Sequence, residues 1–114
     1  METINRRPWG YYQLLSDASN HQVKRIVVEP RGSLSLQRHK MRSEHWYAVA
    51  GEGHATIDGT VVTLRQGIAV DIPQGAVHRL ENISTEKLVI IEVQTGTYFG
   101  EDDIERLEDK YGRI

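Results

Sequence analysis

The sequence predicts an all-β fold, an antiparallel sandwich or barrel built from short strands. Turn-forming residues recur at short and fairly even intervals from Pro30 to Gly96. The runs between them are rich in β-branched residues and in apolar–polar alternation, which is typical of strands. The eight expected strands are Val23 to Glu29, Ser33 to His39, Glu44 to Ala50, Gly53 to Ile57, Thr60 to Leu64, Ile68 to Ile72, Val77 to Asn82 and Leu88 to Gln94.

The clearest local signal is the dipeptide Asp58-Gly59, which lies between two of these runs. Both residue types tolerate the positive φ angles of a two-residue hairpin turn. We therefore expect a tight hairpin that joins the strand ending at Ile57 to the strand beginning at Thr60.

The C-terminal tail has a different period. Ile104, Leu107 and Tyr111 recur at i, i+3 and i+7, the spacing of one helix face. The acidic residues 101–103 precede them, where a helix N-terminus favours negative charge. This pattern predicts a short C-terminal amphipathic helix, packed as a lid on the barrel end or across a partner.

Length and composition limit the chemistry. The chain has 114 residues, a net charge of −2 and no cysteine, so one domain spanning residues 1–114 is expected. Without cysteine, any catalytic or metal chemistry must come from histidine, carboxylate, amide and arginine side chains. A chain of this size buries roughly 65% of the surface that its unfolded form exposes. We expect a homodimer, because association would add to a modest core.

The charge pattern also limits the partners. Basic residues are scattered rather than striped, which argues against a nucleic-acid groove. No segment approaches the ~20 apolar residues of a membrane span, and the N-terminus lacks the apolar core of a signal peptide. We expect a cytoplasmic location and no nucleic-acid or membrane partner. The charge pattern leaves room for a small anionic ligand, for which a few local arginines suffice.

Four side chains are candidate metal ligands. In the segment Gln37-Arg38-His39, alternate residues point to one face of a strand, and Glu44 follows after a four-residue gap. His78 lies on a separate expected strand. Two nitrogen and two oxygen donors would then surround one divalent ion. Such a set suits Zn²⁺, Mn²⁺, Co²⁺, Ni²⁺ or Fe²⁺ and discriminates poorly among them.

The two segments resemble the two conserved motifs of the cupin superfamily, H-x-H-(x)3,4-E-(x)6-G and G-(x)5-P-x-G-(x)2-H-(x)3-N. The second motif matches at every fixed position, which are Gly67, Pro73, Gly75, His78 and Asn82. The first departs twice, because Gln37 replaces the usual histidine and only four residues separate it from Gly32. The resemblance implies a jelly-roll β-barrel, the double-stranded β-helix.

The glutamine indicates a narrower family. The segments Leu34 to His39 and Arg42 to Trp46 resemble the cupin domain of type II phosphomannose isomerases, and so do Arg7 to Gly10, Ile91 to Gln94 and Gly100 to Arg113. In that family the domain often follows a mannose-1-phosphate guanylyltransferase domain. No Gly-rich phosphate loop is present here, so on this length we expect no nucleotide transfer.

The resemblance makes Gln37, His39, Glu44 and His78 the metal ligands, with zinc as the leading ion. It implies interconversion of mannose 6-phosphate and fructose 6-phosphate through an enediol-like intermediate. A metal would act as a Lewis acid on the charge of that intermediate.

The reaction also needs a base and cations for the phosphate. Arg42 lies in the turn between two ligands and can reach the pocket mouth, whereas strand alternation turns His45 and Arg79 away from the metal. His45 remains a candidate base because its ordinary pKa is near neutrality, and Arg79 is a candidate by resemblance. Glu92 is a carboxylate base if Leu88, Ile90, Glu92 and Gln94 line the interior. The opposite register, with Val89, Ile91 and Val93 inside, is equally apolar.

Two other functions fit the same residues. His39, His78 and Glu44 form a two-histidine, one-carboxylate set that could hold Fe²⁺ in an oxygenase, although Gln37 as a fourth ligand argues against it. Alternatively, the domain binds a metal and a sugar phosphate without turnover. Fold alone does not decide among these functions.

Overall fold

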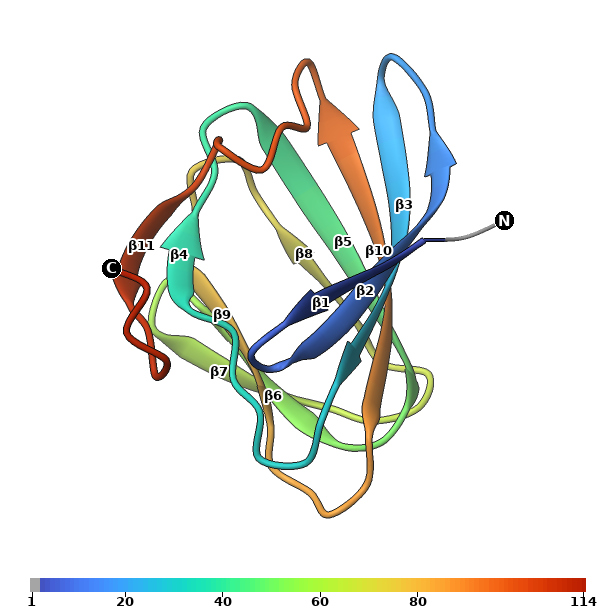
Figure 1. Cartoon of the computed structure of the whole chain (residues 1–114), viewed down its shortest axis with the longest axis vertical. Coiled ribbons are helices and arrows are strands. Elements are labelled where there is room, and N and C mark those ends of the chain that lie inside the picture. The colour runs from blue at the N-terminus through green and yellow to red at the C-terminus, as the bar shows by residue number, and fades with distance from the viewer. Residues whose placement is uncertain (1–2) are drawn as a thin grey trace.

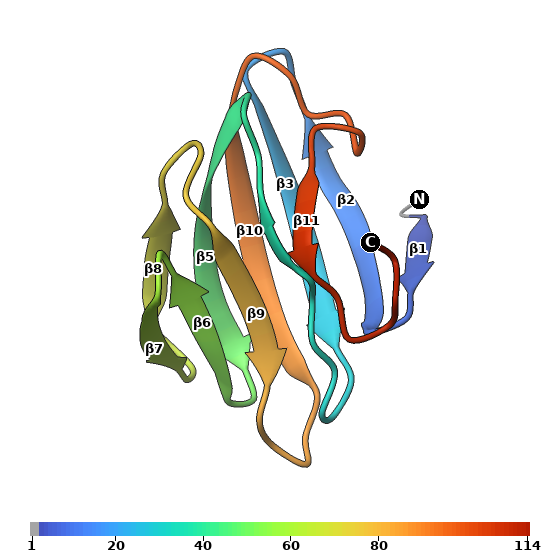
Figure 2. The same cartoon turned by 90° about the vertical axis from the view of Figure 1, so that its left-hand side faces the viewer.

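Two antiparallel sheets face each other and curve into a barrel (Figures 1 and 2). The structure is a computed structural model, and it describes residues 3–114. One sheet has the strand order β1-β2-β3-β10-β5-β8, and the other has the order β11-β4-β9-β6-β7. The strands are β1 Ile4–Arg7, β2 Gly10–Asp17, β3 His21–Val28, β4 Leu36–Arg38, β5 Arg42–Ala50, β6 Gly53–Ile57, β7 Thr60–Leu64, β8 Ala69–Ile72, β9 His78–Asn82, β10 Leu88–Gly96 and β11 Glu105–Glu108.

The all-β fold class is confirmed, and each of the eight expected strands corresponds to one of β3 to β10. The hairpin of β6 and β7 has the expected bounds. Its turn residues Asp58 and Gly59 have φ angles of 47° and 83°, as a two-residue turn with both central residues in the left-handed region requires. Three strands lie outside the predicted set: β1 and β2, which form an N-terminal hairpin, and β11 in the C-terminal tail.

The prediction of a C-terminal helix is wrong. The tail instead forms β11, which pairs antiparallel with β4 and satisfies the backbone groups of that edge strand. The apolar residues of the tail do not share one face, since Leu107 is 40% exposed while Tyr111 packs against the core. The Tyr111 hydroxyl accepts a hydrogen bond from the Ser33 backbone nitrogen, which holds the end of the chain against the barrel.

The central strand of the larger sheet is β10, which pairs with β3 on one side and β5 on the other. The inward-facing residues of β10 are Leu88, Ile90, Glu92 and Gln94. This observation decides between the two registers that the sequence left open. Because β10 crosses the whole barrel, its inward face passes from apolar residues at one end to polar residues at the other.

The apolar end holds the core. Fully buried side chains there include those of Leu64, Leu80, Leu88 and Ile90. Burying an aliphatic side chain of this size contributes about 1.5–3 kcal/mol relative to leaving it in water. The described residues contain no helix long and apolar enough to cross a membrane.

Candidate metal centre

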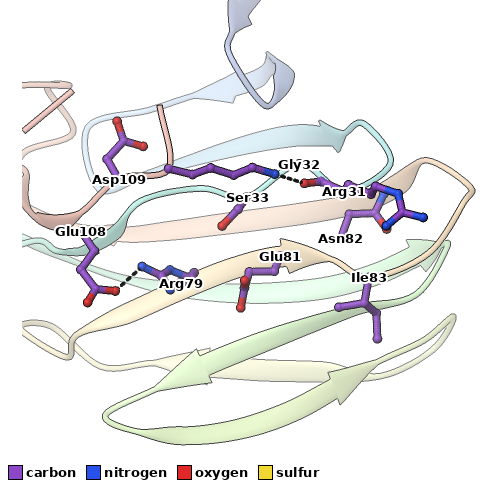
Figure 3. A pocket seen from close by; sticks show the side chains of 10 residues that line it. Arg31, Gly32, Ser33, Arg79, Glu81, Asn82, Ile83, Glu108 and Asp109 are labelled. Atoms are coloured by element: carbon purple, nitrogen blue, oxygen red, sulfur yellow. Dashed lines mark hydrogen bonds and ion pairs between the residues drawn. The ribbon is translucent and has the colours of Figure 1, made fainter. Parts of the chain in front are cut away.

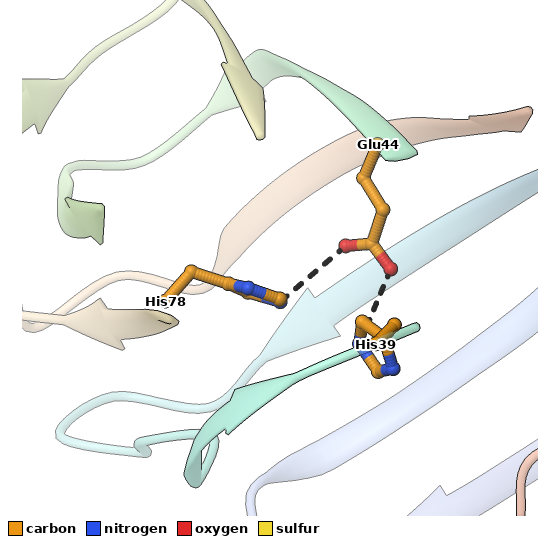
Figure 4. Close-up of side chains that lie close together, drawn as sticks. All are labelled: His39, Glu44 and His78. Atoms are coloured by element: carbon orange, nitrogen blue, oxygen red, sulfur yellow. Dashed lines mark ion pairs between the residues drawn. The ribbon is translucent and has the colours of Figure 1, made fainter. Parts of the chain in front are cut away.

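Three potential metal ligands converge inside the polar end of the barrel (Figure 4). His39 follows β4, Glu44 lies on β5 and His78 begins β9. One ligand atom from each lies within 4.8 Å of the others, and all three side chains are buried. The Glu44 carboxylate lies between the two rings, at 3.4 Å from His39 Nε2 and 3.7 Å from His78 Nε2.

Backbone carbonyls fix both imidazole rings. His39 Nδ1 donates to the carbonyl of Asp103 at 2.6 Å, and His78 Nδ1 donates to the carbonyl of Ala76 at 2.9 Å. Each Nε2 lone pair is therefore directed toward Glu44, which is the arrangement that metal-binding histidines adopt. Burial lowers the pKa of His78, and burial together with the Arg42 charge lowers the pKa of His39 to about 4. Both rings are neutral at pH 7, as metal binding requires.

Arg42 lies against the same cluster. Its Nε donates to Glu44 Oε2 at 3.0 Å, and its Nη2 lies 3.3 Å from His39 Nε2. The guanidinium therefore contacts two of the three potential ligands. The site thus combines three potential metal donors with a buried cation.

A second carboxylate lies behind the first. Trp46 Nε1 donates to Glu44 and to Glu92, each at 3.1 Å, and Gln94 Nε2 donates to Glu92 at 2.7 Å. Burial and then the neighbouring Glu44 charge raise the pKa of Glu92 to about 8. Glu92 therefore holds a proton at neutral pH, because burial and a nearby carboxylate both disfavour its charged form.

These groups line a cavity of about 70 Å³ that also includes Gln37 and Lys24. Two polar atoms there, Arg42 Nη1 and Gln94 Oε1, are buried without a hydrogen-bond partner among residues 3–114. Buried polar groups are normally satisfied, so such atoms point to a missing ligand. The donor set of neutral imidazoles and a carboxylate fits a divalent ion of the first transition row or zinc.

Gln37 lies beside the cluster. It is 9% exposed and pairs in register with His78 across β4 and β9. Its Nε2 donates to the carbonyl of Ser35 at 3.3 Å, so the amide group is partly fixed by its own strand. Gln37 therefore lines the same cavity as His39, Glu44 and His78.

The four candidate catalytic residues separate into two pairs. Arg42 and Glu92 line the cavity. His45 lies on the outer face of β5, where its Nδ1 is 2.7 Å from Asp71 Oδ1. Arg79 lies on the outer face of β9 and donates to Glu108 at 2.7 Å.

Figure 3 shows the surroundings of Arg79, a surface hollow of about 380 Å³ between the smaller sheet and the C-terminal tail. Lys110 Nζ donates there to the carbonyl of Arg31. The hollow lies on the opposite side of the smaller sheet from His39, Glu44 and His78. The structure therefore brings Arg42 and Glu92 to the candidate centre, and it does not bring Arg79 or His45 there.

Three charged residues around the site, Lys24, Glu101 and Asp103, had not been singled out from the sequence. Lys24 faces inward on β3 and is 6% exposed, and its Nζ donates to Glu101 at 3.1 Å. Asp103 accepts hydrogen bonds from the backbone nitrogens of Lys40 and Met41, at 3.0 and 2.9 Å. Lys24 could have been found from the sequence, because it lies two residues from the apolar Ile26 and therefore shares its face of the strand. The roles of Glu101 and Asp103 depend on how the tail folds back, which no local pattern gives.

Sequence comparison places the chain in a known family. Residues 1–109 match the family described as Mannose-6-phosphate isomerase C-terminal. The chain is 47% identical over 108 residues to the mannose-1-phosphate guanylyltransferase ManC of Salmonella typhimurium, which covers 95% of this chain and 22% of that protein. It is 50% identical over 107 residues to the alginate biosynthesis protein AlgA of Pseudomonas putida, with 94% and 22% covered. The chain spans about a fifth of the length of these relatives.

Solved structures agree on the fold. The capsular polysaccharide assembling protein CapF of Staphylococcus aureus superposes with a TM-score of 0.82 at 21% identity, over 96% of this chain and 32% of that chain. A cupin-2 domain from Rhodospirillum rubrum gives a TM-score of 0.69 at 21% identity, over 82% of this chain and 67% of that chain. At these identities the likeness establishes the fold and nothing about activity.

The comparisons correct the predicted function. The relatives described above are named for guanylyl transfer and alginate biosynthesis, and not for mannose-6-phosphate isomerisation. The assignment of this chain as a mannose-6-phosphate isomerase is therefore wrong on these findings. They favour neither of the alternatives, a binding module without turnover or an oxygenase. The resemblance to a cupin domain found beside guanylyltransferases is confirmed, and the chain belongs to the Mannose-6-phosphate isomerase C-terminal family of cupin domains.

Proposed function

We propose that residues 1–114 form the cupin domain of an enzyme of the mannose-1-phosphate guanylyltransferase type, and that this domain binds one divalent metal ion together with a mannose phosphate. The relative at 47% identity, whose name states this activity, supports the enzyme class. Guanylyl transfer itself belongs to that longer protein, of which the chain spans 22%. The proposal for this chain concerns binding inside the barrel.

The observation that carries the proposal is the preorganised cluster of His39, Glu44 and His78. Both imidazoles are neutral, both are oriented by carbonyls, and the carboxylate lies between them. Gln37 would be the fourth ligand. A divalent ion held there supplies a Lewis acid that polarises a bound oxygen.

The residues around the cluster suit a hydroxylated, anionic ligand. Arg42, once released from His39, offers a planar fork of donors that matches a phosphate. Glu92 carries a proton at neutral pH and can donate it in a hydrogen bond to a sugar oxygen. Gln94 Oε1 is free to accept one from a sugar hydroxyl. The Trp46 indole nitrogen donates a hydrogen bond to each of the two carboxyl groups.

Two finer proposals concern the ion and the assembly. Zinc is our choice of ion, because the set of two imidazoles with oxygen donors fits its tetrahedral preference.

We also propose a cytoplasmic homodimer that pairs through the outer face of the larger sheet. That face carries Tyr47 and Val49, which are 44% and 38% exposed, beside the half-buried Ile91 and Val93. Sedimentation equilibrium should give a dimer, and Ile91→Lys a monomer.

The proposal is tested by calorimetry on chain stripped with 1,10-phenanthroline and reloaded with Zn²⁺, Mn²⁺ or Co²⁺. One ion per chain is expected. Mannose 1-phosphate should bind the loaded protein at least about tenfold more tightly than the stripped protein, since the ion and the sugar phosphate would lie next to each other. His45→Ala, whose ring lies outside the barrel, should behave as wild type. Full metal loading with no binding of the sugar phosphate would overturn the proposal for the ligand.

A further inference from the structure

The cavity that holds the metal cluster is too small for a sugar phosphate. Its volume is about 70 Å³, whereas pockets that bind small molecules usually measure about 300–1,000 Å³. A second cavity of about 240 Å³ adjoins it, lined by residues of β2 and β3 and by the segment Phe99 to Glu101. Lys24 and Glu101 line both cavities. This one ion pair therefore contacts both spaces.

Glu101 comes from the connection between β10 and β11, which crosses the upper end of the barrel in Figure 2. Its carboxylate accepts a hydrogen bond from Lys24 Nζ at 3.1 Å and lies 3.7 Å from Arg7 Nη2. The side chain of Glu101 is 51% exposed, while that of Lys24 is 7% exposed. The carboxylate can therefore leave toward solvent, and the ammonium cannot.

The cations around this carboxylate form a preorganised group. Tyr12 orients two of them, with Lys24 Nζ 4.6 Å and the Arg7 guanidinium 5.1 Å from its ring centroid. Burial alone would raise the pKa of Glu101, but Lys24, with smaller effects from Arg42 and Arg7, lowers it. Three positive side chains thus act on one half-exposed carboxylate beside the candidate metal centre.

We infer that the Glu101 carboxylate is an internal substitute for the phosphate of the ligand, and that Lys24 and Arg7 form a phosphate-binding site once Glu101 is displaced. The inference rests on the proposed function for the identity of the ligand as a sugar phosphate. Removing Glu101 alone would leave the buried Lys24 charge without a partner, which is strongly unfavourable. An incoming phosphate monoester replaces the lost charge and merges the two cavities into one of sufficient size.

The inference is tested with inorganic phosphate as the probe, titrated into the chain in 1,10-phenanthroline so that no metal contributes. Glu101→Gln should bind phosphate about tenfold more tightly than wild type, since the competing carboxylate is gone. Glu105→Gln is the matched control, because it removes an equal charge from the same tail, where Glu105 pairs with the exposed Arg38. The control should change the affinity less than twofold, within the range of a surface ion pair.

A second variant locates the site. Adding Lys24→Met to Glu101→Gln should abolish the gain in phosphate affinity, and the double variant should keep the wild-type fold by near-ultraviolet circular dichroism. If Glu101→Gln binds phosphate no more tightly than Glu105→Gln, or if the gain survives the loss of Lys24, the inference is overturned. Metal content is measured separately, so a chain that binds no metal would disprove the proposed metal site and leave this result intact.

A parallel titration with mannose 1-phosphate separates the two sources of a phosphate group. Tighter binding of the sugar phosphate than of inorganic phosphate by Glu101→Gln supports a site that extends into the merged cavity. Equal affinities for the two would contradict the merging of the cavities, because the sugar would then gain no contacts.

Discussion

The two ends of the barrel interior are built by the same strands and have opposite character. Three strands, β3, β5 and β10, run through both ends. At the polar end their inward residues are Lys24, Arg42, Glu44, Glu92 and Gln94. At the apolar end their inward residues are Ile26, Val28, Ala48, Leu88 and Ile90. One continuous sheet therefore carries both a core and a site.

Trp46 marks the boundary between the two ends. It is 1% exposed, its indole nitrogen donates to Glu44 and Glu92, and its ring meets His78 edge-on at 5.6 Å. The apolar body of the ring belongs to the core, and its polar edge belongs to the site. The comparison teaches that stability and chemistry are separated along the strands. Substitutions at the two ends should therefore change different measurable properties.

The largest effect is expected from His78→Ala at the polar end. The variant loses a direct ligand, so zinc affinity should fall more than about 100-fold, beyond the range for residues that only support ligands. Competition with a chromophoric chelator measures this. His45→Ala, on the outer face, is the control and should bind zinc as wild type does. Equal zinc affinities in wild type and His78→Ala would remove the histidine from the ligand set.

Leu80→Ala tests the apolar end. Leu80 is fully buried, so truncation should lower the free energy of unfolding by about 2–5 kcal/mol. Denaturant melts of metal-free protein report this loss. In the folded state the zinc affinity should stay within a few-fold of wild type. A Leu80→Ala variant that is as stable as wild type but binds zinc poorly would break the separation between the two ends.

Asp103→Ala is expected to have a smaller effect on the metal. Its carboxylate holds the backbone of Lys40 and Met41, and its carbonyl orients His39. Loosening that turn should weaken zinc binding by about 10-fold, at the lower end for supporting groups. The matched control is Asp102→Ala, one residue earlier. An effect of Asp102→Ala as large as that of Asp103→Ala would argue against the turn as the cause.

The smallest effect is expected in how steeply the denaturant midpoint of metal-free protein changes with pH. The pKa of His39 is lowered from 6.5 to about 4, chiefly by burial and then by the Arg42 charge. Between these values the unfolded chain binds a proton that the folded chain does not. The contribution of His39 to the stability of metal-free protein is therefore present above pH 6.5 and is lost as the pH falls toward 4. His39→Asn should show a shallower decline in denaturant midpoint over this window, and an unchanged slope would contradict the shifted pKa.

The strands and the ligand spacing were predictable because both are local patterns. Alternation placed Gln37 and His39 on one face of a strand, and the dipeptide Asp58-Gly59 predicted the hairpin turn. The register of β10 was not predictable, since Val89 and Ile91 on one face are as apolar as Leu88 and Ile90 on the other. Only the pairing with β3 and β5 decides it.

The C-terminal tail shows a second limit of prediction from the sequence. Its helical spacing was overridden by pairing of β11 with the edge strand β4, a contact between segments far apart in the chain. The same folding back brings Glu101 to Lys24 and the Asp103 carbonyl to His39. A backbone carbonyl carries no sequence signature, so this support of the site could not be read in advance.

The central claim is that a divalent ion binds between His39, Glu44 and His78. X-ray absorption spectroscopy at the zinc edge of the loaded chain tests it most directly. The account predicts two imidazole nitrogens at about 2.0–2.1 Å with oxygen in the remaining positions. The outer-shell scattering of the imidazole rings should fall by half in His78→Ala. A first shell without imidazole, or with the same imidazole signal in both proteins, would contradict the claim.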